Sequence, residues 1–281
     1  MKFDTIKFEV EENGIGFLTF NRPEKANAIS FQMIEDLHSV LDLLITNLDC
    51  RVLIMKAEGN VFNSGQDLDD ARIIKSKRKP DELKKFYFLD TPEVLKGFMY
   101  FQMRIADIIV KMRKISQPII AAVQGPAIGA GFSITMAADI RLAGKNAKFN
   151  AGYINIGLTG ADMGSSYFLP RLIGLSRASE LLYTGRFFDA EEALKIGFVL
   201  KIIEDDNLVD SAIELAKAML TKSPLGLRLT KQALNLSLDS PSLETMIQLE
   251  SRGQVLSGSS KDVWEAFTAY MEKRDPKFPL C

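Results

Sequence analysis

This 281-residue chain has few residues of the kinds that bind transition metals or form disulfide frameworks. It has two cysteines, Cys50 and Cys281, and a single histidine, His38. The cysteines lie far apart and lack metal-ligand spacing, which favours a reducing compartment and argues against a metal site. His38 falls within a helical pattern away from the polar loops, so we expect it to have a surface or packing role. A Ser-His triad is therefore not expected.

An excess of one charge and long apolar runs are also missing. Lys and Arg number 35, Asp and Glu number 36, and the formal net charge at pH 7 is -1. Because there is no basic stripe and no alternation of basic with aromatic residues, a nucleic-acid partner is not expected. No apolar run approaches bilayer length, and the acidic start MKFDTIKFEVEENG lacks the pattern of a signal or transit peptide. We expect a cytoplasmic protein with no membrane partner.

The apolar content of 47% is enough for one large domain, or for one domain with a helical appendage. Two alternating runs, Ile6 to Val10 and Ile15 to Phe20, flank Asn13-Gly14 and predict a hairpin. Apolar residues at helical spacing predict a helix from Phe31 to about Leu48, with Ser30 as its N-cap.

Strands and helices alternate further along the chain to about residue 205. The pattern predicts strands at Val52 to Ala57, Pro118 to Val123 and Asp139 to Ala143, and a helix at Ile105 to Lys114. Residues 71–100 are first basic and then aromatic, which predicts either a solvated helix followed by an amphipathic one, or a mobile lid that lines a ligand pocket. The remainder is helical, with helices predicted at Leu208 to Leu220, Pro224 to Leu236, Leu243 to Val255 and Val263 to Glu272. We predict an α/β domain over 1–205 and a helical region over 206–281.

The stretch Gln124 to Asp139, QGPAIGAGFSITMAAD, is the most informative for chemistry. An apolar strand ends there in a turn that contains three glycines and Ala130, and a helix-like segment from Phe132 to Ala138 follows. The small residues let a ligand approach the backbone, and the amides at the helix start present a positive dipole end. The spacing matches neither G-x-G-x-x-G nor G-x-x-x-x-G-K-[ST], so the turn suits an oxyanion better than a nucleotide.

This stretch resembles the pattern A-V-x-G-x-A-x-G-G-G-x-E of the crotonase (enoyl-CoA hydratase/isomerase) superfamily. NRPEKANA at Asn21 to Ala28 is similar to the superfamily's N-R-P-x-x-x-N-A loop, and FNSGQDL at Phe62 to Leu68 is similar to its F-x-x-G-A-D-[IL]. SPLGLRLTKQALN near 223–235 and FTAYMEKRDPKF near 267–278 look like its C-terminal helices. The resemblance implies an α/β, crotonase-like spiral of repeated ββα units, in which 206–281 is a helical trimerisation region.

The resemblance also implies an oxyanion hole made of two backbone amides, which by position are those of Gln66 and Ala130. In this superfamily such a pair binds the thioester carbonyl oxygen, where every family reaction places negative charge. Backbone donors tolerate a change of side chain, provided that Ala130 adopts ordinary φ and ψ angles.

Contacts to coenzyme A (CoA) follow from the same resemblance. The superfamily meets the phosphopantetheine and phosphate region at the positions of Lys25 and Ala26, and adenine at those of Ser64, Asp67 and Leu68. Lys273 is expected either to reach a CoA phosphate from a neighbouring subunit or to be an ordinary exposed lysine. The implied ligand is an acyl-CoA thioester, so CoA is part of the substrate and no separate cofactor is expected.

The superfamily's hydratases use two catalytic glutamates, and the matching positions here are Ser133 and Tyr153. Neither side chain is a good acid or base near pH 7, since an unperturbed tyrosine has a pKa of about 10. We expect Ser133 to fill space or hold a water, and Tyr153 to form a pocket wall or donate a hydrogen bond. Asp139, which ends the helix after the glycine turn, is expected to be structural.

A carboxylate lies nearby at Asp162, within GLTGADMGSSYFLPRLIG. Dienoyl-CoA isomerases resemble this segment in having an aspartate within an A-D-x-G element. 4-Chlorobenzoyl-CoA dehalogenase is similar in placing a nucleophilic aspartate four residues before a Ser-Tyr pair, as Asp162 stands before Ser166-Tyr167. Asp162 is therefore the expected acid–base group, and the alternative is that it caps the following helix.

The leading hypothesis is an enoyl-CoA hydratase or isomerase that forms an enolate of an unsaturated acyl-CoA, with Asp162 as its main acid and base. The first alternative is an acyl-CoA or aryl-CoA hydrolase, or a dehalogenase-like enzyme, with Asp162 as nucleophile or base. The second is a catalytically silent acyl-CoA binder. The resemblance implies a homotrimer or a dimer of trimers.

Overall fold

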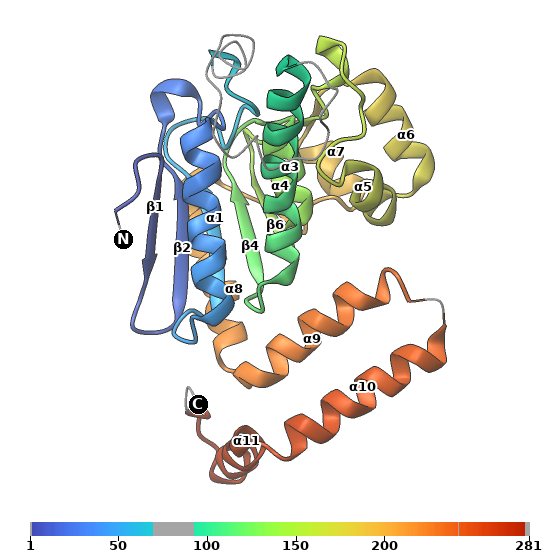
Figure 1. Cartoon of the computed structure of the whole chain (residues 1–281). Coiled ribbons are helices and arrows are strands. Elements are labelled where there is room, and N and C mark those ends of the chain that lie inside the picture. Colours follow the sequence, from blue (N-terminus) through green and yellow to red (C-terminus); the bar gives the residue numbers. More distant parts are fainter. Residues whose placement is uncertain (1, 70–92, 241, 279–281) are drawn as a thin grey trace.

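The computed structural model describes residues 2–69, 93–240 and 242–278, and these form two β-sheets surrounded by helices (Figure 1). The six-stranded sheet has the order β1-β2-β3-β4-β6-β9, and the three-stranded sheet has the order β5-β7-β8. The larger sheet consists of β1 (Ile6–Val10), β2 (Ile15–Phe20), β3 (Val52–Ala57), β4 (Ile119–Val123), β6 (Ile140–Gly144) and β9 (Lys201–Ile203). The smaller consists of β5 (Ala127–Ile128), β7 (Lys148–Asn150) and β8 (Phe188–Asp189). The predicted α/β class is confirmed.

The predicted hairpin is present at the edge of the larger sheet. Strands β1 and β2 pair antiparallel, with Ile6 opposite Phe20. Gly14 has a φ of 92° in the turn, and Asn13 Oδ1 accepts a hydrogen bond from Ile15 N at 2.8 Å. Asn-Gly suits this turn because both residue types tolerate a left-handed backbone. The remaining pairs of this sheet, from β2–β3 to β6–β9, are parallel.

The chain repeats a unit that places one strand in each sheet and then a helix. β4 and β5 are followed by α4 (Ala130–Ala137), and β6 and β7 by α5 (Ser165–Ile173) and α6 (Leu175–Thr184). An earlier unit starts at β3 and reaches the smaller sheet at Asn63, which forms an isolated bridge with Ala127. After β8, α7 (Ala190–Lys195) leads back to β9 in the larger sheet. This topology is the predicted spiral of ββα units.

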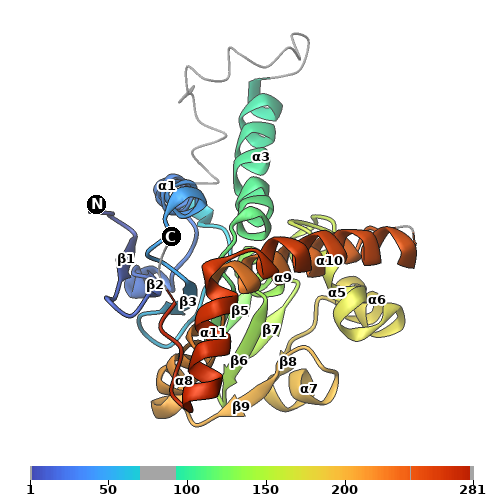
Figure 2. The same ribbon diagram turned by 90° about the horizontal axis from the view of Figure 1, so that it is seen from below.

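Helices cover both faces of the larger sheet, as expected for parallel strands. α1 (Phe31–Thr46) and α3 (Glu93–Lys114) lie side by side over one face, and α8 (Leu208–Leu220) lies over the other (Figures 1 and 2). Successive β2 side chains point to opposite faces. Leu18 belongs to the cluster beneath α1, whereas Phe17 packs with Ala212 of α8. Both faces of the larger sheet are therefore buried.

α1 begins as predicted and ends slightly earlier. Ser30 Oγ accepts a hydrogen bond from Met33 N at 3.1 Å. The helix ends at Thr46, before the predicted Leu48, because Asn47 turns to an extended backbone and its Oδ1 accepts from Cys50 N. His38 has a packing role, since its side chain is buried, with Nε2 2.9 Å from Arg104 O, and burial lowers its pKa.

α3 is longer than the sequence pattern predicted, because it begins at Glu93 and the prediction began at Ile105. The apolar stripe continues toward the N-terminus through Phe101, which is buried and packs edge-on against Phe31, with ring centroids 5.3 Å apart. α3 therefore faces the core at Phe101, four residues before the predicted start of the helix. The lid predicted over 71–100 lies mainly outside the described residues.

The C-terminal helices α9 (Pro224–Ser237), α10 (Leu243–Gly258) and α11 (Lys261–Glu272) extend away from the sheets (Figures 1 and 2). The buried side chain of Lys231, on α9, connects this helix to the α/β domain. Lys231 Nζ lies 2.9 Å from Asp139 Oδ2 and donates to Gln117 O at 2.7 Å. Asp139 also pairs with Arg113 at 2.9 Å, so its role here is structural. Within the described residues, none of the helices is both long and apolar enough to cross a membrane.

Candidate active site

The two loops with the predicted oxyanion amides are joined to each other and to the loop that precedes α1. Ile29 N donates to Gly65 O at 2.7 Å, and Asp67 N donates to Ile29 O at 3.0 Å. This pairing leaves the intervening amide of Gln66 without a partner among the described residues, and the Ala130 amide also has none there. A methyl group on Gly65 would lie 3.6 Å from Ala130 N. The two donor-bearing loops are therefore in contact beside these free amides.

Asn63, which the sequence analysis did not single out, holds the two loops in place. Its backbone N donates to Pro126 O at 3.1 Å, and its O accepts from Ile128 N at 2.9 Å. Its Oδ1 accepts from Gly65 N at 2.9 Å, and its Nδ2 donates to Asn27 O at 2.7 Å. Asn63 is fully buried, so each of these bonds is shielded from water.

α4 begins at Ala130, two residues before the predicted Phe132, which places that amide in the first helical turn. The unusual backbone angles fall on the preceding glycine, since Gly129 has φ 52° and ψ -118°. Ala130 is not one of the residues with positive φ, so the condition set for an alanine at this position is met. The helix start can thus present its amide dipole without straining a side chain.

Ser133, on α4, contacts two residues from other segments, Tyr153 and Asp162. Tyr153 precedes a short 3-10 helix at Ile154–Ile156, and its hydroxyl donates to Gly129 O at 2.9 Å and bonds Ser133 Oγ. Ser133 Oγ also lies 3.3 Å from Asp162 O. Burial raises the pKa of Tyr153 above its ordinary value, so this phenol stays protonated near neutral pH.

The Asp162 side chain does not cap the following helix, so this alternative is wrong. The N-cap of α5 is Gly164, and no side chain caps it. Asp162 Oδ1 instead accepts from Met163 N at 2.7 Å and from Gln102 Nε2 of α3. Among the described residues, Oδ2 has no hydrogen-bond partner.

The Asp162 carboxyl has a raised pKa and lies in a strained turn. Burial raises the pKa of its carboxyl above the ordinary aspartate value, and the bonds from Met163 N and Gln102 offset part of that rise. Met163 has a φ of 44°, a left-handed angle that a methionine rarely adopts. Strain of this kind often occurs at functional sites. The strained turn at Met163 thus holds a carboxyl whose pKa is raised and whose Oδ2 has no hydrogen-bond partner among the described residues.

Comparison with known proteins shows the family of the chain. A profile described as Enoyl-CoA hydratase/isomerase matches residues 10–279. The chain belongs to the enoyl-CoA hydratase/isomerase family. It is similar to a Mycobacterium bovis protein named as a probable enoyl-CoA hydratase, with 38% identity covering 94% of this chain and 89% of that protein. The Escherichia coli 1,2-epoxyphenylacetyl-CoA isomerase is 32% identical, covering 95% of each chain. A solved enoyl-CoA hydratase/isomerase from Cupriavidus metallidurans has a TM-score of 0.82 and 35% identity, covering 99% and 98%.

The residues predicted to contact CoA lie in two places: five are on two adjacent loops, and Lys273 is after α11. Ser64 N donates to Ala26 O at 3.1 Å, which brings the loop of Lys25 beside the loop that leads to Gln66. Lys25 is half-exposed, and its Nζ lies 3.3 Å from Asp69. Of the two other residues predicted to contact CoA on this loop, Leu68 is exposed to solvent. Asp67 is buried and forms an ion pair with Arg22 at 3.0 Å. Lys273 ends α11, at the far end of the molecule from these loops (Figure 1).

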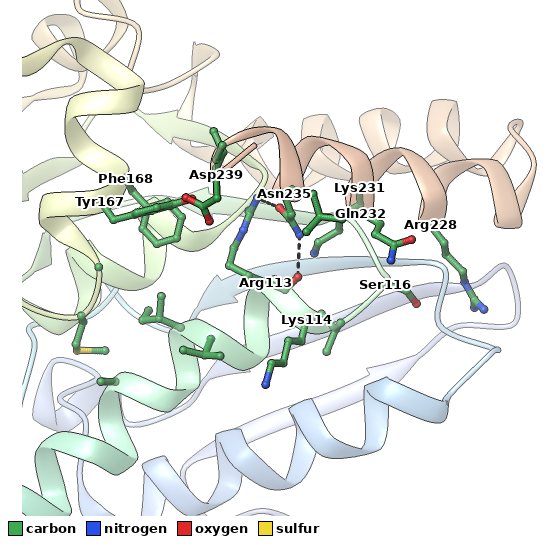
Figure 3. A pocket seen from close by; sticks show the side chains of 18 of the residues that line it. Arg113, Lys114, Ser116, Tyr167, Phe168, Arg228, Lys231, Gln232, Asn235 and Asp239 are labelled. Carbon is green, nitrogen blue, oxygen red and sulfur yellow. Dashed lines mark hydrogen bonds between the residues drawn. The ribbon is translucent and has the colours of Figure 1, made fainter. Parts of the chain in front are cut away.

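A cavity of about 950 Å³ lies between α3, α5 and α9 of this family member (Figure 3). Its wall includes Met163 and Gly164, the residues directly after Asp162. On the opposite side, Arg113 of α3 and Asn235 of α9 point toward one another, and Asn235 Nδ2 donates to Arg113 O at 2.8 Å (Figure 3). The C-terminal region therefore lines the same cavity as the two residues that follow Asp162.

Proposed function

We propose that this enzyme isomerises the double bond of an unsaturated acyl-CoA through an enolate. In this proposal the amides of Gln66 and Ala130 bind the thioester oxygen, and Asp162 transfers the proton. The observation that supports it best is the environment of Asp162. Its carboxyl has a raised pKa, and among the described residues Oδ2 has no hydrogen-bond partner. Its backbone carbonyl lies 3.3 Å from Ser133 Oγ, at the position of one of the superfamily's two glutamates.

One carboxylate is sufficient for this reaction. Ionised Asp162 would take a proton from carbon 2 of a 3-enoyl-CoA, and the electron pair would spread over carbons 2 to 4 and the thioester oxygen. The two amides would stabilise the negative oxygen, where preorganised donors each contribute a few kcal/mol. Return of the proton to carbon 4 gives the 2-enoyl-CoA and regenerates the carboxylate. Every atom of the substrate is kept.

Hydration is the second candidate within the same family, and it makes a further demand. Addition of water needs one group to remove a proton from water and another to protonate carbon 2. Ser133 and Tyr153 are poor candidates for the second group, because the pKa of Tyr153 is raised and serine does not ionise near neutral pH. The names of the relatives do not choose between the two reactions, since a probable enoyl-CoA hydratase and an isomerase of 1,2-epoxyphenylacetyl-CoA both occur among them.

The test compares turnover of 2-enoyl-, 3-enoyl- and 2,5-dienoyl-CoA by the wild type and by Asp162→Asn. We expect the wild type to interconvert 2- and 3-enoyl-CoA, and the variant to lose about 10²- to 10⁴-fold in kcat, the range for a general acid–base group. Asp42→Asn is the matched control, because Asp42 is an exposed aspartate paired with Lys111 on the far side of α3.

Each other result points to a different function. Full activity in Asp162→Asn would refute the role of Asp162. Release of free CoA, or a covalent adduct on Asp162, would support the hydrolytic alternative. Binding of all three thioesters without turnover would support a silent acyl-CoA binder.

We also propose that the enzyme is a homotrimer or a dimer of trimers, that it is cytoplasmic, and that it uses no cofactor beyond the CoA of its substrate. The C-terminal helices support the oligomer because they expose large apolar side chains to solvent. The six most exposed are Leu234, Leu243, Val255, Trp264, Tyr270 and Met271. Light scattering should give a mass of three or six chains of 31.3 kDa, and a monomer would refute this proposal.

A further inference from the structure

The peptide unit between Gly129 and Ala130 has two ends with different surroundings. Its N–H is the free amide of Ala130, which the proposed function assigns to the thioester oxygen. Its C=O, on Gly129, accepts two hydrogen bonds inside the protein. One comes from Tyr153 OH at 2.9 Å and the other from Ser133 N at 3.0 Å. The first of these does not belong to the helix and exists because position 153 is a tyrosine.

One arrangement of the protons accounts for both hydrogen bonds of the Tyr153 hydroxyl. A phenol has a single proton, and Tyr153 gives it to Gly129 O at 2.9 Å. Ser133 Oγ then donates its own proton to the phenol oxygen, since its other contact, to Asp162 O, is longer at 3.3 Å. The result is a chain of donors that runs from Ser133 through Tyr153 to Gly129 O and ends at the Ala130 amide.

Burial and packing fix this chain in position. Ser133 is 0% exposed and Tyr153 is 7% exposed, so water does not compete for these bonds. A Cβ atom placed on Gly129 would lie 3.5 Å from the Tyr153 ring, which shows how closely the ring borders this peptide. Hydrogen bonds in such a chain polarise one another, and a carbonyl that accepts more strongly makes its own N–H a stronger donor.

We propose that Tyr153 and Ser133 are positioning residues, which polarise the Gly129–Ala130 peptide and hold its amide toward the substrate oxygen. Side chains at two positions where the superfamily has catalytic glutamates would thus act behind the oxyanion hole rather than on the substrate's carbon atoms. This inference rests on the proposed function, because it needs the Ala130 amide to bind the thioester. It gives the two positions a role in isomerisation that requires neither side chain to ionise.

The test uses Tyr153→Phe, which keeps the ring and removes only the hydroxyl. Butanoyl-CoA labelled with ¹³C at the thioester carbon is bound at saturation, and its carbonyl stretch is measured by infrared difference spectroscopy. In the wild type we expect the band to shift to lower wavenumber. In Tyr153→Phe that shift should shrink by about 10–30%, the strengthening expected for one bond in a chain. The kcat for 3-enoyl-CoA should fall about 3- to 10-fold with little change in KM, as expected for one neutral hydrogen bond.

Two variants make the result specific. Ser133→Ala keeps the phenol but removes its donor, so it should show a smaller loss of band shift, and it tests the proposal even if Tyr153→Phe does not fold. Tyr183→Phe is the matched control, because it also removes one phenol hydroxyl, but Tyr183 is 79% exposed on α6, so neither kcat nor the band should change.

An unchanged band and kcat in folded Tyr153→Phe and Ser133→Ala would overturn the proposal while leaving the proposed function intact. A lower melting temperature with an unchanged band would show a purely structural role, which also overturns it. If butanoyl-CoA bound to the wild type shows no shift at all, the oxyanion hole itself is wrong, and this inference fails with it.

Discussion

Replacement of Asn63 by alanine should damage both stability and turnover. The two side-chain bonds of Asn63 are lost in Asn63→Ala, and each leaves a backbone partner unsatisfied, namely Asn27 O and Gly65 N. Leaving one buried polar group unpaired costs about 1–3 kcal/mol, so the free energy of unfolding should fall by about 2–6 kcal/mol. Because Gly65 directly precedes Gln66, kcat should also fall as the first oxyanion amide loses its support.

The assay for Asn63→Ala is urea unfolding followed by circular dichroism, together with enoyl-CoA turnover in the absence of urea. Fluorescence is less suitable, since the single tryptophan, Trp264, lies exposed on α11. Asn47→Ala is the matched control, because Asn47 Oδ1 also accepts a buried backbone amide, that of Cys50, at the end of α1. It should lose stability and keep its kcat. Our account of the loops would be wrong if folded Asn63→Ala kept both wild-type stability and wild-type kcat.

Two further predictions concern the same site. Burial raises the pKa of Asp162 in the folded chain above its unfolded value of about 3.9, so ionisation of this residue opposes folding. Asp162→Asn should therefore raise the melting temperature at pH 7, and the gain should shrink as the pH falls through the folded pKa and vanish near pH 3.5; a gain that persists there would contradict this. A methyl group on Gly65, whose φ is +90°, would lie 2.9 Å from Ile128 O, so Gly65→Ala should lower both stability, by about 1–3 kcal/mol, and kcat. Gly197→Ala, with φ +80° and open space around it, should lose stability by unfolding assay but keep kcat, and equal losses of kcat in both variants would refute the role of the loop.

Local signals were sufficient to predict much of the fold. Asn13-Gly14 predicted the hairpin because its backbone preference is intrinsic to the two residues. Ser30 predicted the start of α1 because its cap reaches only three residues along the chain. The helix over Leu208–Leu220 has the predicted bounds. These features depend on neighbours in sequence, which a single chain displays directly.

Features that depend on distant residues were not predicted. Gln102 reaches Asp162 across 60 positions, and Asn63 reaches Asn27 across 36. Neither amide belongs to a local pattern, since Asn63 occupies an unspecified position of F-x-x-G-A-D. The start of α3 was missed because its aromatic residues fit a core stripe only once Phe101 is known to face Phe31. The placement of Ser133 beside Tyr153 likewise needed the fold, although the resemblance had marked both positions.

The free Oδ2 atom of Asp162 has a stereochemical consequence. A carboxylate that offers one oxygen from a fixed turn can approach a flat dienolate from one side only. A proton that leaves carbon 2 would then return to carbon 4 on the same face, so the isomerisation would be suprafacial. Deuterium placed at carbon 2 would then reappear at carbon 4, on that face, in the fraction of turnovers in which transfer is faster than exchange with water. The position and face of deuterium in the product would thus test whether Asp162 offers a single oxygen from one side of the substrate.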